Sequence, residues 1–173
     1  MRGGHGWGRM GRQGGACPRR ISRFLEPCLL LLLRGDADIG IVALPRKDRN
    51  LTIYPFLDEP LVLVVGREHP WAMQKEIDIH KIRFQKFIAF EPGLPTRAHI
   101  DAILANYNVP VRRILEFDNV ETIKRAVEIN AGISILPEPS IGQERLSGAI
   151  TALNITNEHL TRPTALVTRK DKT

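Results

Sequence analysis

The stretch of sequence that decides the fold is ILEFDNVETIKRAVEINAGISILPE, residues 114–138. It opens with an apolar run at 114–117 and closes with a second one at 133–136. Between them, the apolar residues of 120–127 recur at the spacing of one helix face. The stretch therefore predicts a strand, a helix and a second strand joined by short turns. Asp118 and Glu121 have capping-box spacing, and Gly132 lies where a left-handed C-cap is expected.

A second amphipathic helix is predicted after the loop 91–95. Pro95 falls just ahead of the first turn, where proline is tolerated, and Thr96 can act as the N-cap. Pro110 marks the end of the helix. The residues of its apolar face are Ile100, Ile103, Leu104 and Tyr107.

Similar short apolar runs occur on both sides of these helices. The run 39–44 is bounded by acids and by Pro45, as expected for a strand buried on both faces. Strands that alternate with helices over short connections predict an α/β fold with a mainly parallel sheet and helices on both faces. The predicted strands are 39–44, 61–65, 87–90, 114–117, 133–136, 149–155 and 165–168.

The positive charge of the 173-residue chain is confined to its beginning. Six of the 25 basic residues are arginines within 1–23, a segment without acids, so the other 19 balance the 19 acidic residues. The body of the protein is therefore not a basic, nucleic-acid-binding domain. Half of the 14 glycines also lie in this first segment. We expect residues 1–33 to be an Arg/Gly-rich, disordered or atypical segment; an RNA-binding arm is a weaker alternative.

Two further features restrict the class of protein. The leucines of 29–33 are too few for a membrane span, which needs roughly 20 apolar residues, and they are expected to be the tail of a buried helix. Cys17 and Cys28 are the only cysteines, which excludes a disulfide framework in the folded body. Both observations fit a cytoplasmic protein without a membrane partner.

No pattern of catalytic or metal-binding residues is present. None of the serines lies in a G-x-S-x-G turn, the five histidines are scattered, and no phosphate-binding glycine motif follows a strand. We therefore expect no enzyme activity, no cofactor and no metal.

The strongest candidates for ligand contact are two strand-to-helix junctions, 93–97 and 118–122. Exposed backbone N–H groups at a helix start attract anions, and Thr96 and Arg97 lie at the first junction. Ligands of open α/β sheets bind where such junctions meet. The alternative is that Thr96 and Asp118 act only as caps.

Three segments resemble conserved blocks of LysR-type transcriptional regulators. RGDADIGIV at 34–42 is similar to a strand of the family, and EPGLPTR at 91–97 to its effector loop. The third block, within 120–138, is the most specific. The resemblance covers roughly residues 34–170. It implies a two-lobed, periplasmic-binding-protein-like (type 2) Rossmann-like fold, with a small anionic effector in the cleft and two crossover strands as a hinge.

The resemblance also implies a division of the chain and a set of site residues. The second lobe would be 61–150, and the incomplete first lobe 34–60 together with 151–173. The family's helix-turn-helix and the start of its first lobe are not found, so we expect a truncated regulator that reaches DNA only through the missing helix-turn-helix. The intact protein would be a homodimer or tetramer. The implied effector-binding residues are Leu94 (in place of the usual serine), Pro95, Thr96, Arg97, Asn119 and Glu121, with Ala43, Leu44 and Pro45 on the first lobe.

Two other functions fit the same fold. A solute-binding protein of a transporter would carry an export signal, and an enzyme such as a dehydratase would need an acid/base pair in the cleft. Neither feature is visible. An incomplete first lobe would leave the strands at 39–44 and 165–168 exposed, so we also expect self-association.

Overall fold

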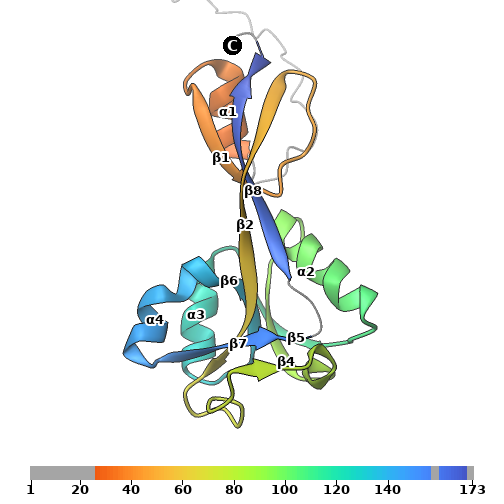
Figure 1. Ribbon diagram of the computed structural model, residues 1–173, viewed down its shortest axis with the longest axis vertical. Coiled ribbons are helices and arrows are strands. Elements are labelled where there is room, and N and C mark those ends of the chain that lie inside the picture. The colour runs from red at the N-terminus through yellow and green to blue at the C-terminus, as the bar shows by residue number, and fades with distance from the viewer. Residues whose placement is uncertain (1–25, 157–159, 171–173) are drawn as a thin grey trace, which may run out of the picture.

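The computed structural model describes residues 26–156 and 160–170. Figure 1 shows two lobes joined by two long crossing strands, β2 and β8. The elements are α1 (Glu26–Arg34), β1 (Ile39–Ala43), β2 (Leu51–Gly66), β3 (Glu76–Ile77), the 3-10 helix η1 (Ile79–Ile82), β4 (Lys86–Phe90), α2 (Pro95–Asn106), β5 (Arg112–Phe117), α3 (Val120–Glu128), β6 (Ser134–Pro137), the 3-10 helix η2 (Glu138–Ile141), α4 (Gly142–Ser147), β7 (Ile150–Ile155) and β8 (Thr161–Arg169).

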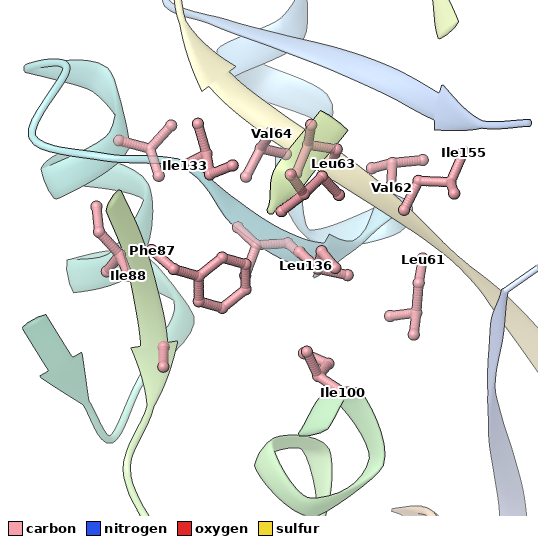
Figure 2. Packing of buried hydrophobic residues seen from close by; sticks show 14 of the residues in the cluster. Leu61, Val62, Leu63, Val64, Phe87, Ile88, Ile100, Ile133, Leu136 and Ile155 are labelled. Atoms are coloured by element: carbon pink, nitrogen blue, oxygen red, sulfur yellow. The ribbon is translucent and has the colours of Figure 1, made fainter. Parts of the chain in front are cut away.

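The second lobe is a mixed sheet with a large apolar core. The end of β2 pairs with β6 on one side and with β7 on the other, and β3 extends the sheet beyond β7. A parallel bridge from Phe87 to Ile133 brings the β4–β5 pair alongside β6. Phe87, Ile88 and Leu136 lie at the centre of this core (Figure 2), and each is at most 2% exposed. The predicted apolar face of α2 is confirmed, because Ile100 and its neighbours pack into the same cluster.

The first lobe is small and covered on one side only. β8 lies between β1 and β2, and α1 packs on one face of these three strands. The core consists of four buried side chains, Leu32, Val42, Leu51 and Val167. On the opposite face, Ile39 and Ile41 are each 63% exposed. The prediction that run 39–44 is buried on both faces is therefore wrong: alternate residues of β1 face solvent.

The crossing strands are longer than the sequence pattern indicated. β2 and β8 pair antiparallel from Leu51 opposite Arg169 to Pro60 opposite Thr161, with an irregularity between Pro55 and Leu57. Proline interrupts the strand pattern of this segment because it cannot donate a hydrogen bond to the ladder. The predicted strands 61–65 and 165–168 are thus parts of β2 and β8.

Strand direction also differs from the prediction. Only β3–β7, β4–β5 and the bridge to β6 are parallel, whereas β1–β8, β2–β6, β2–β7 and β2–β8 are antiparallel. The expected mainly parallel sheet is therefore wrong for the described strands. The crossing strands contribute to the difference. β2 carries the chain from the first lobe into the second, and β8 carries it back, so the two strands run in opposite directions.

The lobe boundaries drawn from the sequence also shift. Residues 26–33, assigned to the atypical first segment, form most of α1, and Leu32 belongs to the first-lobe core. Residues 151–155, assigned to the first lobe, lie in β7, whose Leu153 packs in the second-lobe core. The expectation of disorder for 1–25 lies outside the described residues.

The prediction of Gly132 as the left-handed C-cap of α3 is wrong. The left-handed residue after α3 is Asn130, with φ of 58°, and not Gly132. Gly132 is needed for a different reason: a Cβ there would lie 2.7 Å from the carbonyl oxygen of Lys86. The close approach allows Ile133 N to donate to that oxygen at 2.9 Å, which joins β4 to β6.

The exposed face of β1 predicts self-association. Size-exclusion chromatography and sedimentation of the chain are expected to show oligomers, because apolar side chains on an open sheet face associate. Replacing Ile39 and Ile41 by lysine together should shift the distribution to monomer. The matched control is Met73→Lys with Leu146→Lys, two second-lobe residues that are 95% and 90% exposed. A monomeric wild-type chain would contradict the prediction.

Candidate functional site

The two predicted junctions lie side by side in the structure. β4 and β5 are parallel, so their carboxyl ends, Phe90 and Phe117, meet at the same edge of the sheet. The loops that follow are joined directly, because Glu91 N donates to the Phe117 carbonyl at 2.9 Å. The convergence of the loop before α2 with the loop before α3 is thereby confirmed.

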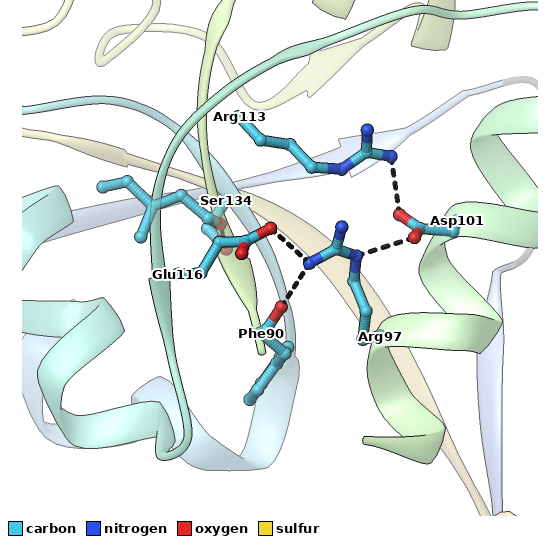
Figure 3. Close-up of polar contacts among 7 residues, drawn as sticks. Phe90, Arg97, Asp101, Arg113, Glu116 and Ser134 are labelled. Atoms are coloured by element: carbon cyan, nitrogen blue, oxygen red, sulfur yellow. Dashed lines mark hydrogen bonds and ion pairs between the residues drawn. The ribbon is translucent and has the colours of Figure 1, made fainter. Parts of the chain in front are cut away.

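Arg97 holds α2 against this edge (Figure 3). Its Nη1 donates to the Phe90 carbonyl at 2.6 Å and to Glu116 at 2.7 Å, and its Nε donates to Asp101 at 2.6 Å. Asp101 also pairs with Arg113 of β5 at 2.8 Å. Burial by itself lowers the pKa of Arg97, but the hydrogen bonds to Asp101 and Glu116 outweigh it and raise the pKa. The Arg97 side chain is 13% exposed and bonds both Phe90 of β4 and Glu116 of β5, so Arg97 acts primarily as a clamp that holds α2 to these strands.

Thr96 lies inside α2 and contacts the crossing strands. The N-cap of α2 is Leu94 and Pro95 is the first helical residue, so the prediction of Thr96 as N-cap is wrong. The Thr96 hydroxyl instead accepts a hydrogen bond from Arg162 Nη1 of β8 at 3.3 Å. The Leu94 side chain is 7% exposed and packs in the core, which leaves its backbone on the loop side.

The start of α3 forms the neighbouring wall. Asn119, and not Asp118, is its N-cap: Asn119 Oδ1 accepts from Thr122 N at 2.9 Å. Asn119 Nδ2 donates to Asp118. Glu121 is 69% exposed and pairs with Lys124 at 2.9 Å. The cap thus moved by one residue from the capping-box expectation, because an asparagine at the turn is as good an acceptor as an aspartate.

The expected first-lobe residues lie beside β8. Ala43 ends β1, and Leu44 adopts a left-handed backbone with φ of 53°. Leu44 N donates to the Pro163 carbonyl at 2.7 Å. Pro45 lines a depression of about 260 Å³ together with Pro163 and residues of β2. The 43–45 segment and Thr96 therefore approach β8 at adjacent residues, 163 and 162.

Sequence reasoning missed the charged residues of the crossing strands. Arg162 donates through Nε to Glu59 Oε2 at 2.8 Å and pairs with it through Nη2 as well. Thr164 Oγ1 donates to the same oxygen at 3.1 Å. Pro60 and Pro163 interrupt the strand pattern next to Glu59 and Arg162. The sequence pattern therefore did not predict that these two charged residues lie on paired strands.

Lys124 supports the start of α3 from within the protein. It is 7% exposed and pairs with Glu121 and Glu144, each at 2.9 Å, and donates to the Ser140 carbonyl. Burial lowers its pKa, but the hydrogen bonds to both glutamates raise it overall. The hydrogen bond from Lys124 holds the pKa of Glu144 below its ordinary value.

The described residues contain no group of three or more His, Cys, Asp or Glu side chains placed to hold a metal ion. Ser134 is buried in β6 and donates to the Ile88 carbonyl at 2.8 Å. Among the helices that the structure describes, none is long and apolar enough to cross a membrane.

The Lys124–Glu144 pair predicts an acid-dependent loss of stability. A carboxylate with a lowered pKa stabilises the fold above its ordinary pKa, about 4.3, and this contribution is lost as the pH falls through the lower folded value. Chemical denaturation between pH 7 and pH 3 should therefore show a smaller pH dependence for Glu144→Gln than for wild type. Lys124→Met should cost about 2 kcal/mol at pH 7, because the partly buried Glu144 loses its counter-charge.

Glu138→Gln is the matched control for this prediction. It removes an exposed ion pair with Arg145, and such pairs contribute roughly 0–1 kcal/mol. An unchanged pH profile for Glu144→Gln would contradict the assignment.

Comparison with known proteins places this geometry in a family. The model of the LysR substrate binding domain matches residues 26–173. A RuBisCO operon transcriptional regulator of Acidithiobacillus ferrooxidans is 31% identical over 130 residues, which cover 75% of this chain and 42% of that protein. The regulator CfxR of Cupriavidus necator is 28% identical and is covered to 45%. The chain thus spans about half the length of the curated relatives it matches.

Solved structures agree with this match. The Synechocystis PCC6803 CcmR regulatory domain in complex with 2-PG has a TM-score of 0.75 and 30% identity, over 86% of this chain and 72% of that one. The reduced form of OxyR from N. meningitidis has a TM-score of 0.70 at 20% identity, over 83% and 66% of the two chains, and shares the fold. The expected periplasmic-binding-protein-like fold is confirmed. The chain belongs to the LysR substrate-binding domain family, a family of transcriptional regulators and not of enzymes.

Proposed function

We propose that this chain is the effector-sensing domain of a LysR-type regulator, and that a small organic anion binds between its lobes at the start of α2. In the longer regulator, this binding would control a helix-turn-helix that contacts DNA, within a homodimer or tetramer. Ligand occupation would change how the lobes are arranged about β2 and β8.

The observation that carries the proposal is the contact between Thr96 and Arg162. This contact brings a hydroxyl near the start of α2 together with a guanidinium nitrogen of the crossing strand β8. N–H groups at a helix start and a guanidinium both favour a negatively charged ligand. The 43–45 segment approaches the same part of β8 from the first lobe. We therefore propose that the anionic group of the ligand binds at the Thr96 hydroxyl.

The remaining residues of the proposed site shape its walls. The backbone of Leu94 and Pro95 forms the loop side, and Asn119 with Glu121 forms the side of α3. Arg97 fixes the direction of α2 through its clamp and offers Nη2, which makes no hydrogen bond within the described part of the chain. The CcmR regulatory domain in complex with 2-PG and the effector binding domain of QuiR in complex with shikimate support a small molecule as the class of ligand.

Calorimetric titration with 2-PG, shikimate, other small carboxylates, sulfate and phosphate tests the proposal. We expect at least one anion to bind, and Thr96→Val to weaken that binding by about tenfold or more, as the loss of one hydrogen bond to a charged group does. Arg97→Ala should weaken binding as well, since it releases the start of α2.

Thr52→Val is the matched control, because Thr52 lies on β2 in the first lobe, opposite Thr168 and away from α2. It should leave the affinity unchanged. Absence of binding across the panel, or equal affinity for wild type and Thr96→Val, would overturn the proposed site.

A further inference from the structure

Helix α2 is attached to the crossing strand β8 at two points. At its start, the Thr96 hydroxyl accepts from Arg162 Nη1 at 3.3 Å. One turn later, His99 Nε2 donates to the carbonyl oxygen of Thr161 at 2.7 Å. Residues three apart on a helix lie on the same face, so one face of α2 bonds two successive residues of β8. Figure 1 shows α2 beside the lower part of β8.

Arg162 is itself held in place by the hinge. Glu59 lies directly opposite Arg162 in the β2–β8 ladder, and its Oε2 accepts from Nε and Nη2 of the guanidinium and from Thr164. Both members of the pair are largely buried, with 19% and 16% of their side chains exposed. A planar guanidinium gripped along one edge presents its other edge in a fixed direction. Here the remaining nitrogen, Nη1, points to Thr96.

The same segment of β8 continues into the first lobe. Immediately above Arg162, the Pro163 carbonyl accepts from Leu44 N, and Thr164 begins the pairing with β1 at Ala43. Residues 161–164 of β8 therefore contact α2 on one side of the hinge and the first lobe on the other. A shift of α2 would reach the first lobe along a continuous hydrogen-bonded strand.

We propose that Arg162 and His99 are positioning residues that make α2 and β8 move as one body, so that a ligand at the start of α2 signals to the first lobe through β8. The signalling role rests on the proposed function. The attachment itself is a property of the ligand-free protein, so it is tested separately.

Amide hydrogen exchange of the full chain without ligand tests the attachment. Arg162→Gln combined with His99→Leu should speed exchange in α2 and in residues 160–164 of β8 by about tenfold or more, as expected when hydrogen bonds to a charged group are lost. Exchange in β6 and β7 should change much less. Arg162→Lys with His99→Gln restores a charge and a donor at the two positions and should recover part of the protection.

Arg145→Gln is the matched control, since it removes one arginine–glutamate pair, between α4 and Glu138 of η2, and involves neither α2 nor β8. The inference is overturned if the double variant speeds exchange uniformly across the second lobe, as a general loss of stability would. It is also overturned if exchange in α2 stays at the wild-type rate.

Exchange in the presence of 2-PG or shikimate tests the signalling role. In wild type, a bound probe should protect the start of α2 and residues 161–168 of β8. In the His99→Leu variant, which keeps Thr96 and Arg162 of the proposed ligand site, the probe should still protect α2 but should protect β8 less. Equal protection of β8 in both proteins overturns the inference and leaves the proposed function intact. If neither probe binds, the proposed function loses its support, and the ligand-free experiment still decides the attachment.

Discussion

The antiparallel pairing of β2 with β8 is the interaction on which the rest of the structure depends. It runs from Leu51 opposite Arg169 to Pro60 opposite Thr161 and joins the two lobes. Each lobe has its own apolar cluster, one large and one of four residues. The small cluster buries too little surface to define a lobe by itself, so the first lobe relies on the ladder for its shape.

The charged residues near this ladder divide two tasks between them. Arg97 joins α2 to β4 through the Phe90 carbonyl and to β5 through Glu116, and so fixes the helix within the second lobe. Arg162 joins the same helix to the hinge. Because Arg97 ties the start of α2 to β4 and β5, and Arg162 ties it to β8, this helix start is fixed in its own lobe and connected to the hinge. These are the properties that a ligand sensor at a hinge requires.

Much of the fold followed from local patterns. The helix at 95–106, the helix at 120–128 and the strand at 133–136 were predictable because apolar periodicity and short connections leave few alternatives. The caps were displaced by one or two residues: Leu94 in place of Thr96, and Asn119 in place of Asp118. Asn119 and Asp118 are nearly equivalent as caps, whereas Leu94 makes no side-chain cap hydrogen bond. In both cases the start of the helix depends on how the loop packs and not on the sequence pattern.

What the sequence by itself determined was the family, the strand-and-helix order of the second lobe and the two junctions at its edge, since these depend on short-range periodicity and on motifs. Only the tertiary structure decided the direction of the strands, the one-sided burial of β1 and the presence of Arg162 and Glu59 beside Thr96. Those features depend on pairing between β2 and β8, whose charged residues lie about a hundred positions apart. Local patterns carry no information about which distant strand a residue will face.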